Sequence, residues 1–181
     1  SHAEIIFRTR NGGVMENRKR EAGILMPVFS LPGDYGIGSF GKEAREFVDL
    51  LSETGNGIWQ VLPMGPTGFR DSPYQSFSAF AGNPYFIDLE ILEKEGLLSE
   101  ADLALEREAF LSSEEKVDYG LVYERRYPLL RKAYENWKEM GGNPEELLAK
   151  CSRESFDYCL FMAIKEHFEG KAWIHFPKAF R

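Results

Sequence analysis

The stretch from residue 69 to residue 86, FRDSPYQSFSAFAGNPYF, combines aromatic rings with short polar side chains and a single acid, Asp71. Aromatic rings supply rigid contact area at a low cost in side-chain entropy, while amides, carboxylates and hydroxyls take hydrogen bonds. A ligand that needs both has apolar faces and a rim of hydroxyls, and sugars fit that description. The polar groups are Asp71, Ser72, Gln75, Ser76, Ser78 and Asn83, and the rings are Phe69, Tyr74, Phe77, Phe80 and Tyr85.

The same composition has a second interpretation, which is a loop folded on itself. Pro66, Pro73 and Pro84 would then fix its turns, and the rings would fill a small local core. Composition alone does not decide between the two interpretations.

A glycine-rich segment, GIGSFG at residues 36–41, matches the G-x-G-x-x-G pattern of dinucleotide-binding folds. Two features argue against that use. The glycines of such a fold begin where the first strand ends, and here LPGDY intervenes. The second strand should end near an acid that binds the ribose, and here it ends in LPMGP. We therefore interpret the glycines as a flexible turn between a strand and a helix.

The sequence offers few metal ligands or nucleophiles. Cys151 and Cys159 form neither a disulfide framework nor a C-x-x-C site, and we expect two small buried thiols in or near helices. This fits a reducing cytoplasm. His167 has no second ligand four residues away, so we expect it on a helix face. We predict neither a metal nor a cofactor.

Two buried strands and a helix are expected to position the aromatic stretch. GILMPVFSL (23–31) and IWQVLPM (58–64) are short apolar runs that turn formers close, and two such strands joined by a helix usually pair in parallel. The aromatic stretch follows the second strand, and parallel α/β folds bind ligands at that end of their strands. The helix between them is predicted to have Ser39 as N-cap, an apolar stripe of Phe40, Ala44, Phe47, Val48 and Leu51, and its end at Gly55.

Helices are predicted for the rest of the chain. The signals are a capping box at Ser99 and Asp102, an apolar period over residues 119–140 that ends at Gly141-Gly142, an N-cap at Asn143 with Pro144 in the first helical position, and a final helix, SFDYCLFMAIKEHF, that Gly170 stops.

Composition excludes several classes of function. The 181 residues are 43% hydrophobic, which predicts a globular chain, and the net charge of -7 argues against a nucleic-acid partner. No apolar run approaches the roughly 20 residues of a membrane span. The first residues lack the apolar core and the cleavage site of a signal peptide. We expect residues 1–14 to be linker or non-native sequence, and the protein to be cytoplasmic.

The order of the predicted elements is unusual for a complete domain. Two strands at the front precede a block of helices, and a two-stranded parallel sheet leaves two open edges. A closed (β/α)₈ barrel needs about 250 residues. We therefore expect this chain to be the first part of a longer protein.

Several motifs together resemble one family, the 4-α-glucanotransferases of glycoside hydrolase family 77. The longest is LPMGPTGFRDSPYQSFSAFAGNPYFIDLE (62–90), and GILMPVFSLPGDYGIGSFG, VDYGLVYERRYPLLRKAY and the closing W-x-x-F-P are similar to further parts of the family's sequence. The resemblance covers roughly residue 22 to the C-terminus.

The resemblance implies the N-terminal part of a (β/α)₈ TIM barrel with an inserted, mainly helical subdomain. The barrel would start at residues 15–88, the subdomain would comprise residues 89–181, and the remainder of the barrel would be absent. The implied activity is the transfer of α-1,4-glucan segments between maltodextrins by a retaining double displacement, without a cofactor. The partners would be maltooligosaccharides or α-1,4-glucan, and the missing part of the barrel.

The resemblance also implies a set of substrate-binding residues, namely Phe69, Asp71, Ser72, Pro73, Tyr74 and Gln75. Tyr74 is the best candidate for a substrate contact. Phe69 stands where the family usually has tyrosine, so a hydroxyl is missing at a secondary glucan site. The family's catalytic carboxylates come from later strands, so no catalytic residue is assigned, and Asp71 is interpreted as a binding or structural acid.

Two alternatives to an enzyme fragment stay open. One is a non-catalytic glucan-binding fragment or one chain of a split enzyme, because the aromatic loop is present without the catalytic groups. The other is an α-amylase-type hydrolase, which releases products to water where a transferase passes them to another sugar.

Overall fold

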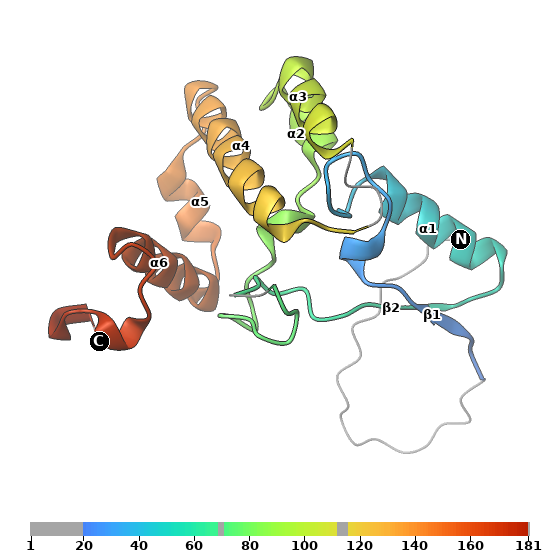
Figure 1. The fold of residues 1–181 in the computed structure, drawn as a ribbon, viewed down its shortest axis with the longest axis horizontal. Coiled ribbons are helices and arrows are strands. Elements are labelled where there is room, and N and C mark those ends of the chain that lie inside the picture. Colours follow the sequence, from blue (N-terminus) through green and yellow to red (C-terminus); the bar gives the residue numbers. More distant parts are fainter. Residues whose placement is uncertain (1–19, 69–70, 112–115, 181) are drawn as a thin grey trace. The chain divides into compact units, whose positions relative to one another are not determined.

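The computed structural model describes residues 20–68, 71–111 and 116–180 (Figure 1). These residues form two compact units, and each unit is discontinuous in sequence. The first joins the chain up to Pro63 with Pro84–Ala133, and the second joins Met64–Asn83 with the chain from Tyr134 onward. The boundary expected at residues 88 and 89 concerns a longer fold and stays a prediction.

The first unit contains a parallel pair of strands, as predicted. β1 (Gly23–Leu25) pairs with β2 (Ile58–Gln60), with Gly23 opposite Ile58. Both strands are shorter than the apolar runs around them. Pro27 lacks a backbone N–H for the ladder, and a 3₁₀ turn (Val28–Ser30) replaces the rest of the first run.

The prediction that these strands are buried is wrong. Ile24 is 39% exposed, Leu25 is 53% exposed and Ile58 is 45% exposed. Within the described ranges, β1 and β2 form a sheet of two strands, and a parallel pair needs cover on both faces to bury its side chains.

The helix between the strands, α1 (Lys42–Glu53), begins later than predicted. Ser39 is not its N-cap, because the Ser39 hydroxyl donates to Asp88 Oδ2 over 2.8 Å. Gly41 holds the cap position without a side-chain hydrogen bond, and a Cβ there would collide with the Asp88 carboxylate. The predicted end is confirmed, since Gly55 follows the helix at φ 76°.

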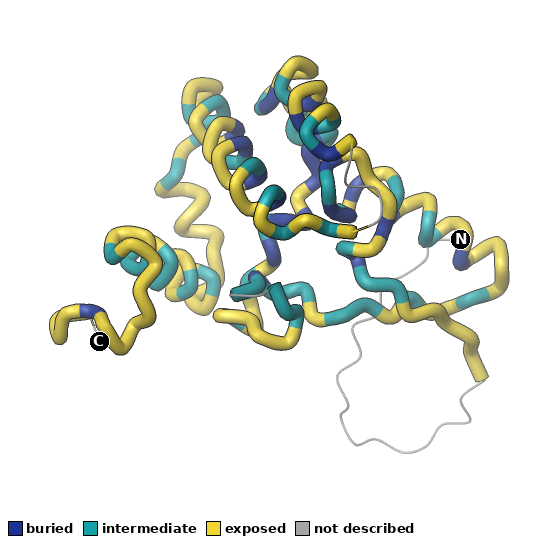
Figure 2. Tube along the Cα trace, in the orientation of Figure 1, coloured by how far each residue is buried: buried dark blue, intermediate teal, exposed yellow. Residues whose placement is uncertain are grey.

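The core of the first unit lies where three helices meet, which Figure 2 shows as a concentration of dark blue. They are α2 (Leu89–Lys94), α3 (Glu100–Phe110) and α4 (Tyr119–Glu139). The cluster consists of Tyr35, Leu89, Leu98, Leu103, Leu129 and Ala133. The predicted capping box of α3 is confirmed, because Ser99 and Asp102 bond to each other's backbone N–H.

The second unit includes α5 (Pro144–Lys150) and α6 (Arg153–His167), neither of which buries a residue. The predicted helix signals between α4 and α5 are confirmed. Gly142 N–H donates to Trp137 O and Gly141 adopts φ 94°, which is a Schellman end. Asn143 then caps α5, with Pro144 in its first turn.

The prediction of buried thiols is wrong, because Cys151 and Cys159 are both exposed. Cys151 follows the last residue of α5 and Cys159 lies on α6, and neither helix has a neighbour that buries it among the described residues. Three 3₁₀ turns complete the described chain, at Pro84–Phe86, Trp173–His175 and Lys178–Phe180. The helices of the described ranges include none that is long and apolar enough to cross a membrane.

Candidate functional site

The aromatic stretch folds back on itself as a hairpin within the second unit. Thr67 and Ser76 form an antiparallel bridge, and Gly68 N–H donates to Gln75 O over 3.3 Å. Gln75 N–H in turn donates to Ser72 O over 3.0 Å, which closes a turn at the tip. The base of the stretch is closed by Asn83 N–H, which donates to Met64 O over 3.0 Å. Four hydrogen bonds or bridges therefore fix a segment that has no long helix or strand.

The serine hydroxyls of this hairpin bind its own backbone. Ser76 Oγ donates to Ser78 O over 2.6 Å, and Ser78 Oγ accepts from the N–H groups of Phe80 and Ala81 over 3.1 Å each. Ser72 Oγ accepts from Tyr74 N–H over 3.4 Å. Such local bonds are how serine stabilises turns. For Ser76 and Ser78, the interpretation as a self-supporting loop is therefore the better one.

Three rings of the aromatic stretch are exposed and do not fill a local core, whereas Tyr85 at its end is buried. Tyr74 and Phe80 are each 73% exposed, and Phe77 is 45% exposed. Contiguous exposed apolar patches mark contact surfaces, so three exposed rings on one hairpin are a candidate for such a surface. The hairpin thus spends several hydroxyls on its own fold and leaves its rings available to a ligand.

One helix braces the hairpin from the side. Lys165 Nζ of α6 lies 4.1 Å from the centroid of the Phe77 ring, and the Phe161 ring of the same helix lies 6.2 Å from it. A cation over an aromatic face is held by the ring's quadrupole. The part of the hairpin next to Tyr74 is therefore tied to a regular element.

The predicted substrate-binding residues are distributed over this hairpin. Asp71, Ser72 and Pro73 are half-buried, while Tyr74 and Gln75 are exposed at the turn. Phe69 lies outside the described residues, so its assignment as a substrate-binding residue stays a prediction. The contacts of Asp71, Ser72, Pro73, Tyr74 and Gln75 with a ligand stay predictions as well.

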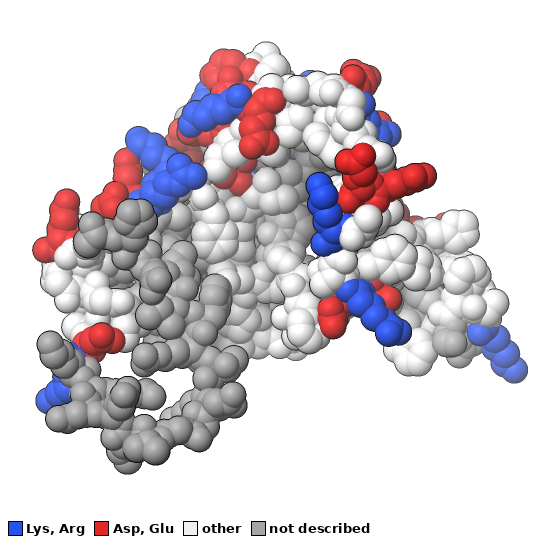
Figure 3. Space-filling view, turned by 180° about the vertical axis from the view of Figure 1, so that it is seen from behind, with Lys and Arg blue, Asp and Glu red and all other residues white. Residues whose placement is uncertain are grey.

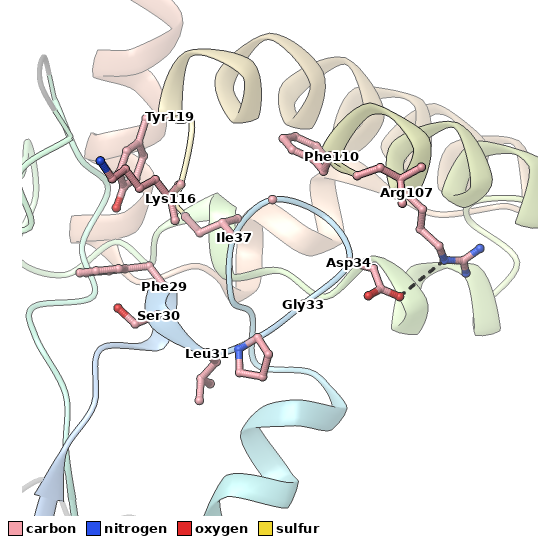
Figure 4. Close-up of a pocket in the computed structure, with 14 residues that line it drawn as sticks. Phe29, Ser30, Leu31, Gly33, Asp34, Ile37, Arg107, Phe110, Lys116 and Tyr119 are labelled. Carbon is pink, nitrogen blue, oxygen red and sulfur yellow. Dashed lines mark ion pairs between the residues drawn. The ribbon is translucent and has the colours of Figure 1, made fainter. Parts of the chain in front are cut away.

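A pocket in the first unit has a volume of about 850 Å³ (Figure 4). The loop that carries Phe29 and Ile37 forms one wall, and Phe110 and Tyr119 contribute to the other. Arg107 at its rim already forms ion pairs with Glu100 at 2.7 Å and with Asp34 at 3.9 Å. This pocket therefore offers apolar walls more than free polar groups, and it does not include the predicted residues.

A ladder of tyrosines on the first turns of α4 was missed by the sequence analysis. Tyr123 lies 5.1 Å from Tyr127, ring to ring, and buried Tyr85 contacts both Tyr127 at 6.0 Å and Tyr119 at 6.5 Å. Tyr123 is 61% exposed, so the ladder presents a ring to solvent on a rigid helix. The spacing of four residues between Tyr119, Tyr123 and Tyr127 is the signal that could have revealed it.

Charged groups do not form a site for a metal or a polyanion in the part of the chain that is described. No group of three or more His, Cys, Asp or Glu side chains there is arranged to hold a metal ion. Acidic and basic side chains are interspersed on the face that Figure 3 shows. Buried Arg126 donates hydrogen bonds to Tyr35 O and Ile87 O, so it supports the core and is not free to bind an anion. Its burial lowers its pKa to about 10.

Comparison with known proteins decides the family. The profile of the 4-alpha-glucanotransferases, glycoside hydrolase family 77, matches residues 26–181. The chain belongs to this family. It is 48% identical over 164 residues to the 4-alpha-glucanotransferase of Streptococcus pneumoniae, and 46% identical over 168 residues to that of Thermus thermophilus. Each alignment covers 90% of this chain and 32% of the relative, so the chain spans about a third of the length of these relatives.

The backbone is also similar to a solved structure of the family, the amylomaltase from Streptococcus agalactiae in complex with acarbose. The TM-score is 0.73 at 42% sequence identity, and the match covers 88% of this chain and 32% of that one. The resemblance stated from the long motif is thus confirmed, and the dinucleotide interpretation of GIGSFG is not needed. Gly38 and Gly41 permit close backbone packing instead, since a Cβ at either would collide with Val28 O or the Asp88 carboxylate.

Proposed function

We propose that this chain is the N-terminal part of a 4-α-glucanotransferase that transfers α-1,4-glucan segments between maltodextrins. The observation that carries the proposal is the hairpin of residues 64–83, which lies inside the family match and presents Tyr74 with 73% of its surface exposed. A flat, exposed ring with amide and hydroxyl groups beside it suits the apolar face and the hydroxyl rim of a glucose unit.

The proposed fold is the beginning of a (β/α)₈ barrel. β1, α1 and β2 would be its first β-α-β unit, and the hairpin follows the C-terminal end of β2 along the chain, where such barrels place their ligand-binding loops. In a complete barrel, the outer helices and the strands on the opposite side would cover Ile24, Leu25 and Ile58, which are exposed in this chain. The helices after residue 88 would be an inserted subdomain.

The proposed chemistry is a retaining double displacement. One carboxylate attacks the anomeric carbon and a second carboxylic acid protonates the leaving oxygen, then deprotonates the acceptor hydroxyl. We assign neither role to this chain. The half-buried Asp71 accepts a hydrogen bond from Thr67 inside the hairpin, which suits a structural or binding acid. The chemistry requires no metal or organic cofactor.

The proposed substrate contacts are those of the hairpin tip, with Tyr74 as the main ring and Ser72, Pro73 and Gln75 beside it. Asp71 and Phe69 complete the set that the resemblance implies. The exposed ring of Tyr123 offers a second surface on which a glucan could stack.

The proposed location is the cytoplasm. Two exposed cysteines without a disulfide in the described chain fit a reducing cytoplasm.

The test compares the full-length gene product with residues 1–181 alone, using maltotriose as the substrate. The full-length product should release glucose and longer maltodextrins while the number of reducing ends stays constant, because transfer conserves glycosidic bonds. Rising reducing ends would indicate an α-amylase-type hydrolase instead. Turnover by residues 1–181 alone would contradict the assignment of the catalytic carboxylates to other residues.

A glucan-binding fragment without activity is the second candidate, because the hairpin is held within the chain by its own hydrogen bonds and by α6. Titration of residues 1–181 with maltoheptaose tests whether this chain binds glucan by itself. Trp59, which shortly precedes the hairpin in the sequence, is the reporter. Absence of a fluorescence or NMR response at millimolar ligand would count against binding by this chain alone.

A further inference from the structure

The hairpin contains a hydrogen bond between two side chains that no proposed substrate contact requires. Thr67 Oγ1 donates to Asp71 Oδ1 over 3.0 Å, and the Asp71 N–H donates to Gly68 O over 3.0 Å. The side chain and the backbone of Asp71 are therefore both tied to the strand of the hairpin that precedes it. This pair closes the turn on one side.

The backbone of Asp71 has an unusual conformation at this turn. Its φ is 52°, in the left-handed region that residues other than glycine adopt rarely and that aspartate and asparagine tolerate better than most. The chain reverses there, since the next residues lead through Ser72 to Gln75, whose N–H returns to Ser72 O. A change in Asp71 would therefore alter the direction in which the tip leaves the hairpin.

We propose that Asp71 is a positioning residue, which acts through Thr67 to hold the Tyr74 ring in the orientation that a glucan stacks on. This inference rests on the proposed function, and for Asp71 it replaces the direct substrate contact that the resemblance implies with a positioning role. The anchors on the two sides of the tip are the Thr67–Asp71 bond and the bond from Gly68 N–H to Gln75 O. Tyr74 lies between them and makes its own contact through its N–H to Ser72 Oγ.

The proposal separates the geometry of Asp71 from its charge. Asparagine in this position keeps an Oδ1 acceptor for the Thr67 hydroxyl and tolerates the left-handed backbone, but carries no charge. Alanine loses the acceptor and is strained at a positive φ. For Thr67, serine keeps the donor hydroxyl, and valine keeps the shape without the donor. The two pairs of substitutions therefore test the same hydrogen bond, one pair at its acceptor and the other at its donor.

The experiment measures kcat and KM for maltotriose disproportionation in the full-length gene product. D71A and T67V should each raise KM by about five- to tenfold and lower kcat less, because they loosen a binding surface. D71N and T67S should keep KM close to the wild-type value, because each keeps its side of the hydrogen bond. The double variant D71A/T67V should be no worse than D71A, because both substitutions remove the same bond.

Two further measurements keep the outcomes distinct. Hydrogen exchange of the amides from Ser72 to Ser76 should speed up several-fold in D71A and T67V and stay near the wild-type rate in D71N, whether or not the protein is active. Y74A reports on the proposed function itself, and an unchanged KM in Y74A would reject the hairpin as the glucan surface.

The proposal is overturned if D71N is as impaired as D71A while its amides exchange at the wild-type rate. The charge of Asp71 would then act on the substrate directly. It is also overturned if T67V leaves both KM and amide exchange unchanged, since the bond from Thr67 would then position nothing.

Discussion

Lys165 Nζ lies 4.1 Å from the centroid of the Phe77 ring, and this contact ties helix α6 to the hairpin that carries the predicted substrate-binding residues. The Phe161 ring one turn earlier on α6 lies 6.2 Å from Phe77. The proposed glucan surface thus depends on a helix about 90 residues later in the chain. A loop at a binding site is precise only when a regular element supports it.

Removing the cation should loosen the hairpin. We expect K165M to raise the exchange rate of the Ser76 to Phe80 amides by about two- to fivefold, since a cation–π contact at an exposed site contributes about 0.5–1 kcal/mol. K165R should preserve the contact because guanidinium also stacks on rings. Hydrogen–deuterium exchange measures both variants, with K150M on α5 as the control. Equal exchange in K165M and wild type would contradict the bracing role.

Arg126 should be far more important for stability than an exposed arginine. It is 3% exposed and donates to Ile87 O and Tyr35 O, so R126A leaves two carbonyls unpaired and opens a void in the core of the first unit. We expect a loss of about 3 kcal/mol or more in the free energy of unfolding, measured in urea. R45A on the exposed surface of α1 is the matched control and should change it by less than about 0.5 kcal/mol. A small effect of R126A would mean that the helices close over the site.

The sequence predicted the elements whose signals are local. The capping box of α3, the N-cap and first-turn proline of α5 and the glycine ends of α1 and α4 all involve residues within a few positions of each other. Hydrogen bonds over such short separations depend little on the rest of the fold. The parallel pairing of β1 and β2 was predicted as well, because a helix between two strands restricts their direction.

The errors came from contacts between distant residues. Ser39 carries a good capping side chain, but Asp88, 49 residues later, takes its hydroxyl and excludes a Cβ at Gly41. In the hairpin, the types of residue did not reveal which groups the fold uses internally. The turn geometry sets that division, since it directs Ser76 and Ser78 to the backbone and leaves the ring of Tyr74 in solvent.

Acid should weaken the packing of α3 against α4 through Asp102. Hydrogen bonds from the Lys132 ammonium at 2.7 Å and from Ser99 hold the pKa of Asp102 at about 2, below its usual value near 4. The unfolded chain therefore binds more protons between about pH 4 and pH 2, and stability falls as the pH is lowered through this window.

Urea unfolding of wild type and D102N at pH 5 and at pH 2.5 checks this expectation. Wild type should lose more stability than D102N between the two pH values, because asparagine does not titrate. D102N should already be less stable at pH 5, since Lys132 loses its charged partner. An equal loss in both proteins would show that other carboxylates cause the acid sensitivity.

The tyrosine ladder of α4 predicts a contribution to glucan binding that is independent of the hairpin. Tyr123 is 61% exposed and its ring is supported by Tyr127 at 5.1 Å, so it offers a fixed face at little further cost in side-chain entropy. We expect Y123A to weaken binding of maltoheptaose to the full-length gene product by about two- to tenfold, and Y123F to keep most of the affinity because the ring makes the contact. Isothermal titration calorimetry measures the Kd values. Y134A is the control, because Tyr134 lies on the same helix but stacks on Trp137. If Y123A binds maltoheptaose as tightly as Y134A and the wild type do, the ladder serves packing with Tyr85 alone, and the glucan surface is confined to the hairpin.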